Sequence, residues 1–314
     1  MTDQLDIEPT PAEPVEETLE WERQQGPRAA IAASIAAIAT LAGGIISSSA
    51  LSGQPHVALV TSMQNASQPG AETRPSLRAP QLAYIHDKQA TLILGGVILA
   101  IGYFALIPVL GYLYRATKAR RPELPRALLV LALIGPALLG VAAIVFQVAL
   151  TQKAGDFVNS TNHTRQAVDD VTDAGLLRGV QILNLPGTLC LAFSLVLLSL
   201  NAMRAGLLTR FMGVLGMICG AALVLLPQNP VVVFWLLALA VLFAHRWPQG
   251  MPPAWETGTA VPWPSTTELA ERRAAARGEA PKRAAEPEPE PDLGSDSGLS
   301  THPTSKKRKR KRRH

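Results

Sequence analysis

Hydrophobic residues along this chain are gathered into six long blocks that are separated by shorter polar stretches. The blocks cover residues 29–51, 89–114, 127–150, 179–203, 211–227 and 230–246. Most of them reach the roughly 17–25 residues that an α-helix needs to cross a bilayer. The pattern therefore predicts an all-α, polytopic bundle of six transmembrane helices over residues 29–246.

Polar segments flank the predicted bundle on both sides. Residues 1–28 carry eight acidic side chains and only two basic ones, and we expect a disordered acidic tail. Residues 247–265 combine Trp and Pro, which is typical of a segment lying along the headgroup layer. Residues 266–314 are predicted to be a disordered tail with an acidic Pro-Glu run and a polybasic end.

The first apolar block differs from a secretory signal. It follows an acidic segment rather than a positive one, and it is longer than an ordinary signal core. Small residues at 48–50 would suit a cleavage site, so removal of this block is the alternative. We expect the block to be retained as the first span.

Basic residues in the short connections predict the orientation. Connections 115–126 and 204–210 hold seven Lys and Arg in 19 positions, whereas the connections on the other side hold six in 67. The side with the denser positive charge usually faces the cytoplasm. We therefore expect a multi-pass protein of the cell (cytoplasmic) membrane with both termini in the cytoplasm. The external connections are then an irregular loop at 52–88 and a segment at 151–178 with room for a helical turn.

Composition narrows the class of protein further. The chain has 314 residues, of which 48% are hydrophobic and 17% charged, and its net charge is +5. The segregation of the apolar residues excludes a soluble enzyme built around one large core. Two cysteines, Cys190 and Cys219, are too few for a disulfide scaffold or a cysteine zinc cluster, and we expect buried free thiols.

Small residues recur at four-residue spacing in two of the predicted spans. In the first span they occupy positions 32, 36, 40, 44 and 48, and in the fifth they are Gly216 and Gly220, with Gly213 one turn earlier. Such faces let a neighbouring helix backbone approach closely. We interpret them as packing surfaces inside the bundle; a dimer seam is the alternative.

Polar side chains inside a membrane are costly and mark candidate sites. Arg178, Gln181 and Asn184 share one face at the external end of the fourth span, and Gln147 lies near the external end of the third. One hypothesis is a water-filled, outward-facing pocket for a small solute. The alternative is that these residues anchor helix ends or form hydrogen bonds between helices.

Signatures of catalysis and of cofactor binding are absent from the sequence. There is no His-Glu-x-x-His, no phosphate-binding glycine loop and no Gly-x-Ser-x-Gly, and the six histidines are scattered. Spans two to six contain no Asp or Glu. We therefore expect no catalytic residues, no cofactor and no metal site.

Three segments stand out in the sequence, and they begin at Tyr112 (YLYRATKARRPELPR), at Gly206 (GLLTRFMGVLGMICG) and at His245 (HRWPQGMPPAWETGTAVPWPS). Together they resemble a family of uncharacterised bacterial, chiefly actinobacterial, multi-span membrane proteins of the domain-of-unknown-function kind. The resemblance runs from about residue 29 to 265. It implies a membrane topology and a bacterial location, and no activity.

Three classes of function remain open from the sequence. The first is a non-enzymatic membrane protein with a structural or partner-binding role, which we favour. The second is a small-solute binder or transporter that uses the outward-facing polar pocket. The third, a membrane-embedded enzyme, requires a catalytic constellation that the sequence does not display.

The polybasic end of the chain has three candidate binding partners: anionic lipid, nucleic acid or an acidic protein surface. We favour transient contact with anionic lipids of the inner leaflet. No stacking aromatic or folded reader accompanies the run, so any binding to nucleic acid would be nonspecific and salt-sensitive. A solvated tail without a fixed partner is the alternative. The eight adjacent cations are Lys306, Lys307, Arg308, Lys309, Arg310, Lys311, Arg312 and Arg313.

The predicted orientation is tested by topology reporters fused at Ser67, Thr117, Thr161, Thr209 and the C-terminus. We expect external signals at Ser67 and Thr161 and cytoplasmic signals at the other three. An external signal at the C-terminus would contradict the orientation, and a mature chain that starts near Leu51 would show that the first block is cleaved.

Overall fold

The structure is a computed structural model, and every regular element among its described residues is a helix. It describes residues 15–56, 58, 60, 63–64, 67, 76–172, 175–225, 230–248, 250–263, 268 and 275. Contacts divide the chain into two units, Met1–Trp263 and Pro264–His314. Only Glu268 and Ala275 are described in the second unit, so the predicted tail at 266–314 lies otherwise outside the described residues.

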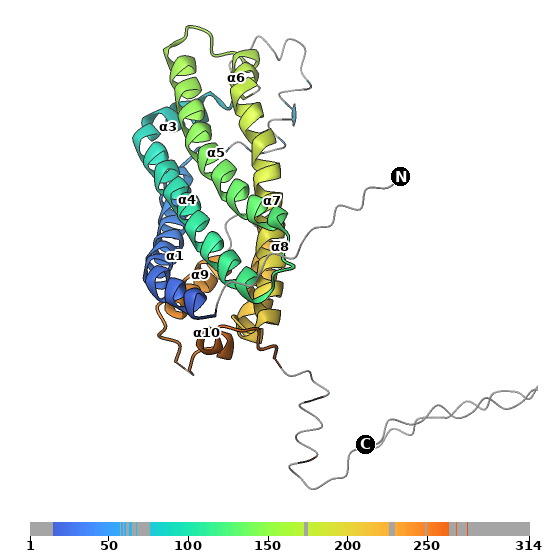
Figure 1. The fold of residues 1–314 in the computed structure, drawn as a ribbon. Helices are drawn as coiled ribbons and strands as arrows, with labels where there is room; N and C mark the ends of the chain where they lie inside the picture. Colours follow the sequence, from blue (N-terminus) through green and yellow to red (C-terminus); the bar gives the residue numbers. More distant parts are fainter. Residues whose placement is uncertain are drawn as a thin grey trace, which may run out of the picture. The chain divides into compact units, whose positions relative to one another are not determined.

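Four long helices form the body of the first unit (Figure 1). They are α1 (Val15–Leu51), α4 (Gln89–Arg120), α5 (Arg126–Asn159) and α7 (Gly175–Ala205). Each is long and apolar enough to cross a membrane. At 1.5 Å per residue they measure about 46 to 55 Å, so all exceed the roughly 30 Å hydrocarbon core.

Two shorter apolar helices follow, α8 (Arg210–Leu225) and α9 (Pro230–Phe243). Their lengths, about 24 and 21 Å, are less than the thickness of the hydrocarbon core. The first turn of α8 lies beside α9, because the Trp235 indole N–H donates to the Met212 carbonyl at 3.0 Å. The six apolar blocks thus correspond to six helices, of which four are long enough to cross the membrane.

The remaining helices are short and lie at the two ends of the bundle. Helices α3 (Ala79–Asp87) and α6 (Arg165–Thr172) are at one end and α10 (Pro253–Thr257) is at the other (Figure 1). The prediction of an irregular loop over 52–88 is wrong for α3, since Leu82 and Ile85 are buried in a small apolar cluster that gives this stretch a packing face. Helix α6 lies within the 151–178 connection, for which a helical turn was predicted.

The predicted disordered tail at 1–28 is wrong from Val15 onward, because α1 begins there. Acidic residues in the first turn of α1 favour a helix start. Tertiary contacts then hold the extension in place: the Trp21 ring stacks on Tyr112 at 5.2 Å, and the Arg115 guanidinium lies 4.3 Å from the Trp21 ring centre. Residues 1–14 lie outside the described part of the chain.

The Trp/Pro segment also differs from its prediction. The prediction places its tryptophans at the headgroup layer, whereas Trp255 is buried in the protein. Its indole N–H donates to the Leu207 carbonyl at 2.8 Å. The Trp263 indole N–H donates to the Leu208 carbonyl at the same distance. Carbonyls at the end of a helix lack partners within that helix. The turn after α7 supplies such carbonyls, and the two tryptophans fold the segment back onto the bundle.

Large apolar side chains are exposed on every long helix of the bundle. Ile38 on α1 is 62% exposed, Leu94 on α4 53%, Val130 on α5 51% and Phe193 on α7 57%. An exposed apolar surface of this extent is unusual for a water-soluble protein and is the surface that a bilayer covers.

The two basic connections lie at one end of the bundle together with α10. An Arg121 guanidinium N–H donates to the Asn201 side-chain oxygen at 3.0 Å, which joins the 115–126 connection to the end of α7. The backbone N–H of Val261 donates to the Ala205 carbonyl at 3.1 Å. We call this end the basic end. Its composition agrees with the prediction that both connections lie on the same side.

Candidate functional site

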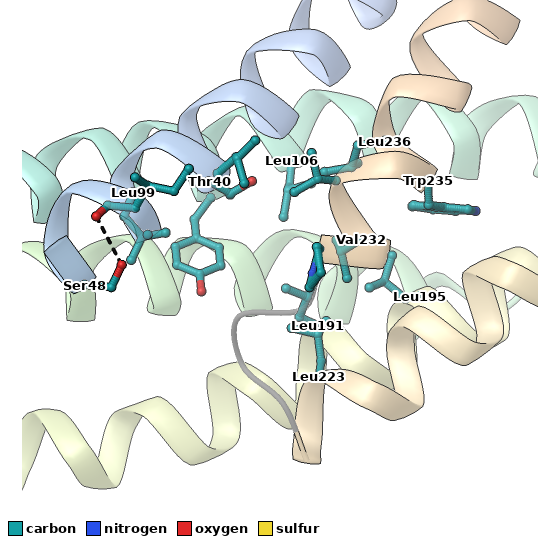
Figure 2. Close-up of a pocket in the computed structure, with 16 residues that line it drawn as sticks. Thr40, Ser48, Leu99, Leu106, Leu191, Leu195, Leu223, Val232, Trp235 and Leu236 are labelled. Carbon is teal, nitrogen blue, oxygen red and sulfur yellow. Dashed lines mark hydrogen bonds between the residues drawn. The ribbon is translucent and has the colours of Figure 1, made fainter. Parts of the chain in front are cut away.

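A cavity of about 190 Å³ lies inside the bundle, between α1, α4, α7, α8 and α9 (Figure 2). Its wall consists mainly of Leu and Val side chains, with three hydroxyl-bearing residues, Thr40, Ser48 and Tyr103. No charged side chain is among the described residues that line it. The cavity therefore suits an uncharged, largely apolar molecule.

The rotation of α1 against α4 decides which residues face the cavity. A Cβ atom on Gly43 would lie 2.6 Å from the Leu99 backbone nitrogen, and one on Gly102 would lie 2.6 Å from the Thr40 side chain. The two helices are therefore in backbone contact along this edge, as membrane helices with small residues are. The adjacent edge of α1, with Thr40, Gly44 and Ser48, borders the cavity.

This arrangement revises the interpretation of the small-residue face on α1. Ala36, toward the basic end, is fully buried in the core, as a packing surface requires. Gly44 and Ser48 instead border the cavity, and Thr40 both packs on Gly102 and borders it. Helix α9 begins at Pro230, which itself lines the cavity. On α8, by contrast, Gly216 and Gly220 pack on Ser199 and Ala192 of α7, as predicted.

The cavity runs from an exposed rim to a buried floor. On α1, Leu41 is 44% exposed and Ile45 is 56% exposed, although both line the cavity. At the other extreme Leu236 and Trp235 are completely buried. Because the rim residues lie among the exposed apolar side chains of α1, the cavity opens toward the lipid-facing surface.

The four residues predicted to form an outward-facing pocket are not brought together around this cavity. Arg178, Gln181 and Asn184 are exposed on α7. Gln147 is partly buried on α5 and lies against Gly96 of α4, with its side-chain oxygen lacking a partner among the described residues. The cavity therefore does not correspond to the predicted outward-facing pocket, which stays a prediction.

The residues that line the cavity were not predicted as site residues from the sequence. Tyr103 lies in the middle of the second apolar block, and its polar tip is a signal of the same kind as the polar residues that we singled out. The space around Thr40, Gly44 and Ser48 has no signal in the sequence, because small residues that pack and small residues that leave a cavity look alike.

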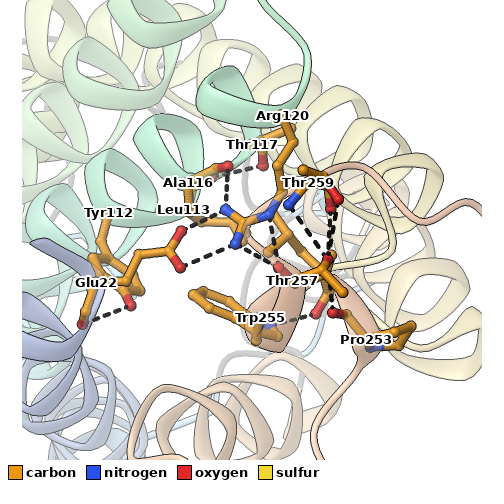
Figure 3. A network of polar contacts seen from close by, with 12 residues as sticks. Glu22, Tyr112, Leu113, Ala116, Thr117, Arg120, Pro253, Trp255, Thr257 and Thr259 are labelled. Carbon is orange, nitrogen blue, oxygen red and sulfur yellow. Dashed lines mark hydrogen bonds and ion pairs between the residues drawn. The ribbon is translucent and has the colours of Figure 1, made fainter. Parts of the chain in front are cut away.

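A buried network of polar contacts lies at the basic end and joins α1, α4 and α10 (Figure 3). The Arg120 guanidinium pairs with the Glu22 carboxylate, with one N–H donating to Glu22 Oε2 at 3.0 Å. It also donates to the Ala254 carbonyl at 2.6 Å and to the Ala116 carbonyl at 2.9 Å. We call Glu22, Arg120 and Ala254 the ion-pair cluster.

The ion-pair cluster is almost completely shielded from solvent, with Arg120 and Glu22 side-chain exposures of 0% and 1%. The Trp255 ring lies 5.5 Å from the guanidinium and covers it, and the Tyr112 hydroxyl donates to the Glu22 carbonyl at 3.4 Å. A carboxylate used in this way neutralises a buried cation and is not available as a catalytic base.

A polar cavity of about 320 Å³ adjoins the cluster, lined by Glu22, Arg23, His245 and Glu256 among others. Among the described residues, no group of three or more His, Cys, Asp or Glu is placed to hold a metal ion. Cys190 is partly buried and Cys219 is buried, both as free thiols.

The apolar exterior and the four long helices define the chain as an integral membrane protein with an all-helical bundle. A family model described as Domain of unknown function (DUF4386) matches residues 35–247, about two-thirds of the chain. The chain belongs to this family, which agrees with the resemblance seen in the sequence. The match includes the whole cavity and Arg120, whereas Glu22 and α10 lie outside it. No curated protein and no solved structure matches the chain.

Loss of one partner of the ion-pair cluster is expected to destabilise the bundle strongly. Glu22→Gln leaves the buried guanidinium without a countercharge, which costs about 3–5 kcal/mol in comparable pairs. Replacing both partners by apolar residues, as in Glu22→Leu with Arg120→Met, should recover most of that loss. The measurement is the free energy of unfolding of the purified protein in mixed micelles, followed by tryptophan fluorescence.

The matched control is the exposed pair of Lys153 and Asp156, whose charged atoms lie 3.4 Å apart. Asp156→Asn should change the free energy of unfolding by less than about 1 kcal/mol. If Glu22→Gln has no larger effect than Asp156→Asn, the ion-pair cluster is not a stabilising element of the fold.

Proposed function

We propose that this is a non-enzymatic protein of the cell membrane that binds a small, membrane-soluble molecule in the cavity between α1, α4, α7, α8 and α9. The observation that carries the proposal is the cavity itself, an apolar space of about 190 Å³ with its rim at the lipid-facing surface. For comparison, a cavity of about 150 Å³ lined by Leu, Ile and Phe stays dry and binds benzene.

The polar groups of the basic end support a role without catalysis. Arg120 and Glu22 satisfy each other and the chain's own carbonyls, and Trp255 and Trp263 donate to carbonyls after α7. Each of these interactions holds one part of the chain against another. A structural or partner-binding role that uses no ligand is the competing proposal.

We also propose six crossings with both termini in the cytoplasm. Helix α8 begins and α9 ends at the basic end, so a crossing by each returns the chain to the side from which α8 starts. The density of Lys and Arg at the basic end favours the cytoplasm for that side.

Ligand binding in the cavity is tested with the diazirine of cyclohexanone, a photoreactive probe with a hydrocarbon ring, added to the full chain in lipid nanodiscs. We call it the hydrocarbon probe, or the hydrocarbon. Its six-membered ring matches the size of the cavity. We expect peptides that carry residues 99–106 and 232–236 to be labelled on illumination, as read by mass spectrometry. Gly44→Leu and, from the opposite wall, Val232→Phe should each reduce this labelling about tenfold by filling the space.

Gly111→Leu is the matched control, because a Cβ atom on Gly111 would meet nothing within 4 Å and the position is outside the cavity. It should leave the labelling of both peptides unchanged. Equal labelling in the unsubstituted chain and both filled variants, with the fold intact by thermal unfolding, would refute ligand binding in the cavity and leave the structural role.

The polybasic run at 306–313 is proposed to contact anionic lipids of the inner leaflet. Each cation near such a leaflet contributes at most about 1 kcal/mol, and salt screens the attraction. A 264–314 peptide should bind vesicles in proportion to their anionic lipid content, and a peptide with the eight cations replaced by Gln should not. Binding that ignores anionic lipid, or that survives about 0.5 M salt, would contradict the electrostatic account.

A further inference from the structure

The three hydroxyl groups on the cavity wall are not equivalent. Thr40 donates to the Ala36 carbonyl at 2.6 Å, one turn earlier on its own helix. Ser48 donates to the Ile45 carbonyl at 3.1 Å in the same way. Both hydroxyl protons are therefore used within α1, so these two residues have no hydroxyl proton left to donate to a ligand.

Tyr103 differs because its hydroxyl has no hydrogen-bond partner among the described residues, although its ring packs against the apolar core. A phenol hydroxyl transferred from water to an apolar environment without a partner is unfavourable by a few kcal/mol. Tyrosines in such places usually have a partner for the hydroxyl. The cavity is the space from which such a partner can come.

The other indole and hydroxyl groups near the cavity do not substitute for Tyr103. The Trp235 N–H, at the buried floor, already donates to the Met212 carbonyl. Tyr103 is therefore the one side chain among the described residues of the wall that has a hydrogen-bond donor to offer a ligand.

From these positions we infer that the cavity takes an uncharged amphiphile: a ring or short chain with one hydroxyl or carbonyl oxygen that accepts a hydrogen bond from Tyr103. This inference rests on the proposed ligand binding and names the chemical class of the ligand. The absence of charge from the described wall disfavours an ionised group. The size of the space suits one ring rather than a complete phospholipid.

The rim of the cavity indicates the route by which such a molecule enters. Leu41 and Ile45 are exposed on the lipid-facing side of α1, and the exposed Ser48 lies one turn beyond Ile45. A molecule dissolved in the bilayer reaches the rim without passing through water. A weakly water-soluble alcohol or ketone is therefore favoured over a hydrophilic solute.

The experiment compares two photoreactive probes of the same shape in the full chain in nanodiscs. One is the diazirine of cyclohexanone and the other is the diazirine of 4-hydroxycyclohexanone, which adds a single hydroxyl group. At equal concentration in the membrane, the alcohol should label the cavity peptides about three- to tenfold more than the hydrocarbon, as one neutral hydrogen bond predicts. Tyr103→Phe should remove this preference and leave hydrocarbon labelling unchanged.

Tyr84→Phe is the matched control, since it removes the same hydroxyl group from α3, outside the cavity, and should keep the preference for the alcohol. If the hydrocarbon labels the cavity peptides but the alcohol has no advantage, or keeps it in Tyr103→Phe, the inference about Tyr103 is wrong and ligand binding stands. If neither probe labels these peptides in a manner sensitive to Gly44→Leu, ligand binding itself is refuted.

Discussion

The backbone contact between α1 and α4 is the constraint on which the cavity depends. Gly43, Gly95 and Gly102 bring the helices so close that a Cβ atom on any of them would lie within 2.6 Å of an atom of the other helix. In a bilayer the hydrophobic effect does not drive helices together, so close van der Waals packing of this kind is a main source of association. The contact fixes the rotation of α1 and turns Thr40, Gly44 and Ser48 toward the cavity.

The ion-pair cluster and the two tryptophan hydrogen bonds complete the fold at the basic end. They tie the first turns of α1 and the segment after α9 to α4 and to the turn after α7. A buried ion pair is weak evidence for net stability, because desolvation offsets the attraction between the charges. Its value here is positional, since the Arg120 guanidinium of α4 binds both Glu22 of α1 and the Ala254 carbonyl of α10.

The cavity lies between helices of different lengths. Helices α1, α4 and α7 measure about 46 Å or more, whereas α8 and α9 measure about 24 and 21 Å. The shorter pair fills the bundle near the basic end, where Trp235 and Leu236 are completely buried. The apolar space lies beside the first turns of α9, where Pro230, Val232 and Leu236 line it together with residues of the long helices.

Much of the fold and little of the candidate site could be predicted from the sequence. Each apolar block lies within or almost within one helix. In lipid the backbone N–H and C=O groups must be hydrogen-bonded within the protein, and for a single apolar stretch of this length the helix does so. The resemblance to the family was also visible in the sequence and is confirmed. The polar residues chosen as a pocket, by contrast, do not line the cavity, since the hydropathy of a segment says nothing of which helices face each other.

The sequence by itself determined the class of protein, the apolar helices and the concentration of positive charge at one end, all of which are local properties of the chain. Tertiary structure alone decided that Glu22 pairs with Arg120, 98 positions away, and that Trp21 at the start of α1 stacks on Tyr112 of α4. It also decided which small residues of α1 pack and which line a cavity. Those outcomes depend on distances between helices, because a glycine next to a backbone and a glycine next to a space are the same residue in the sequence.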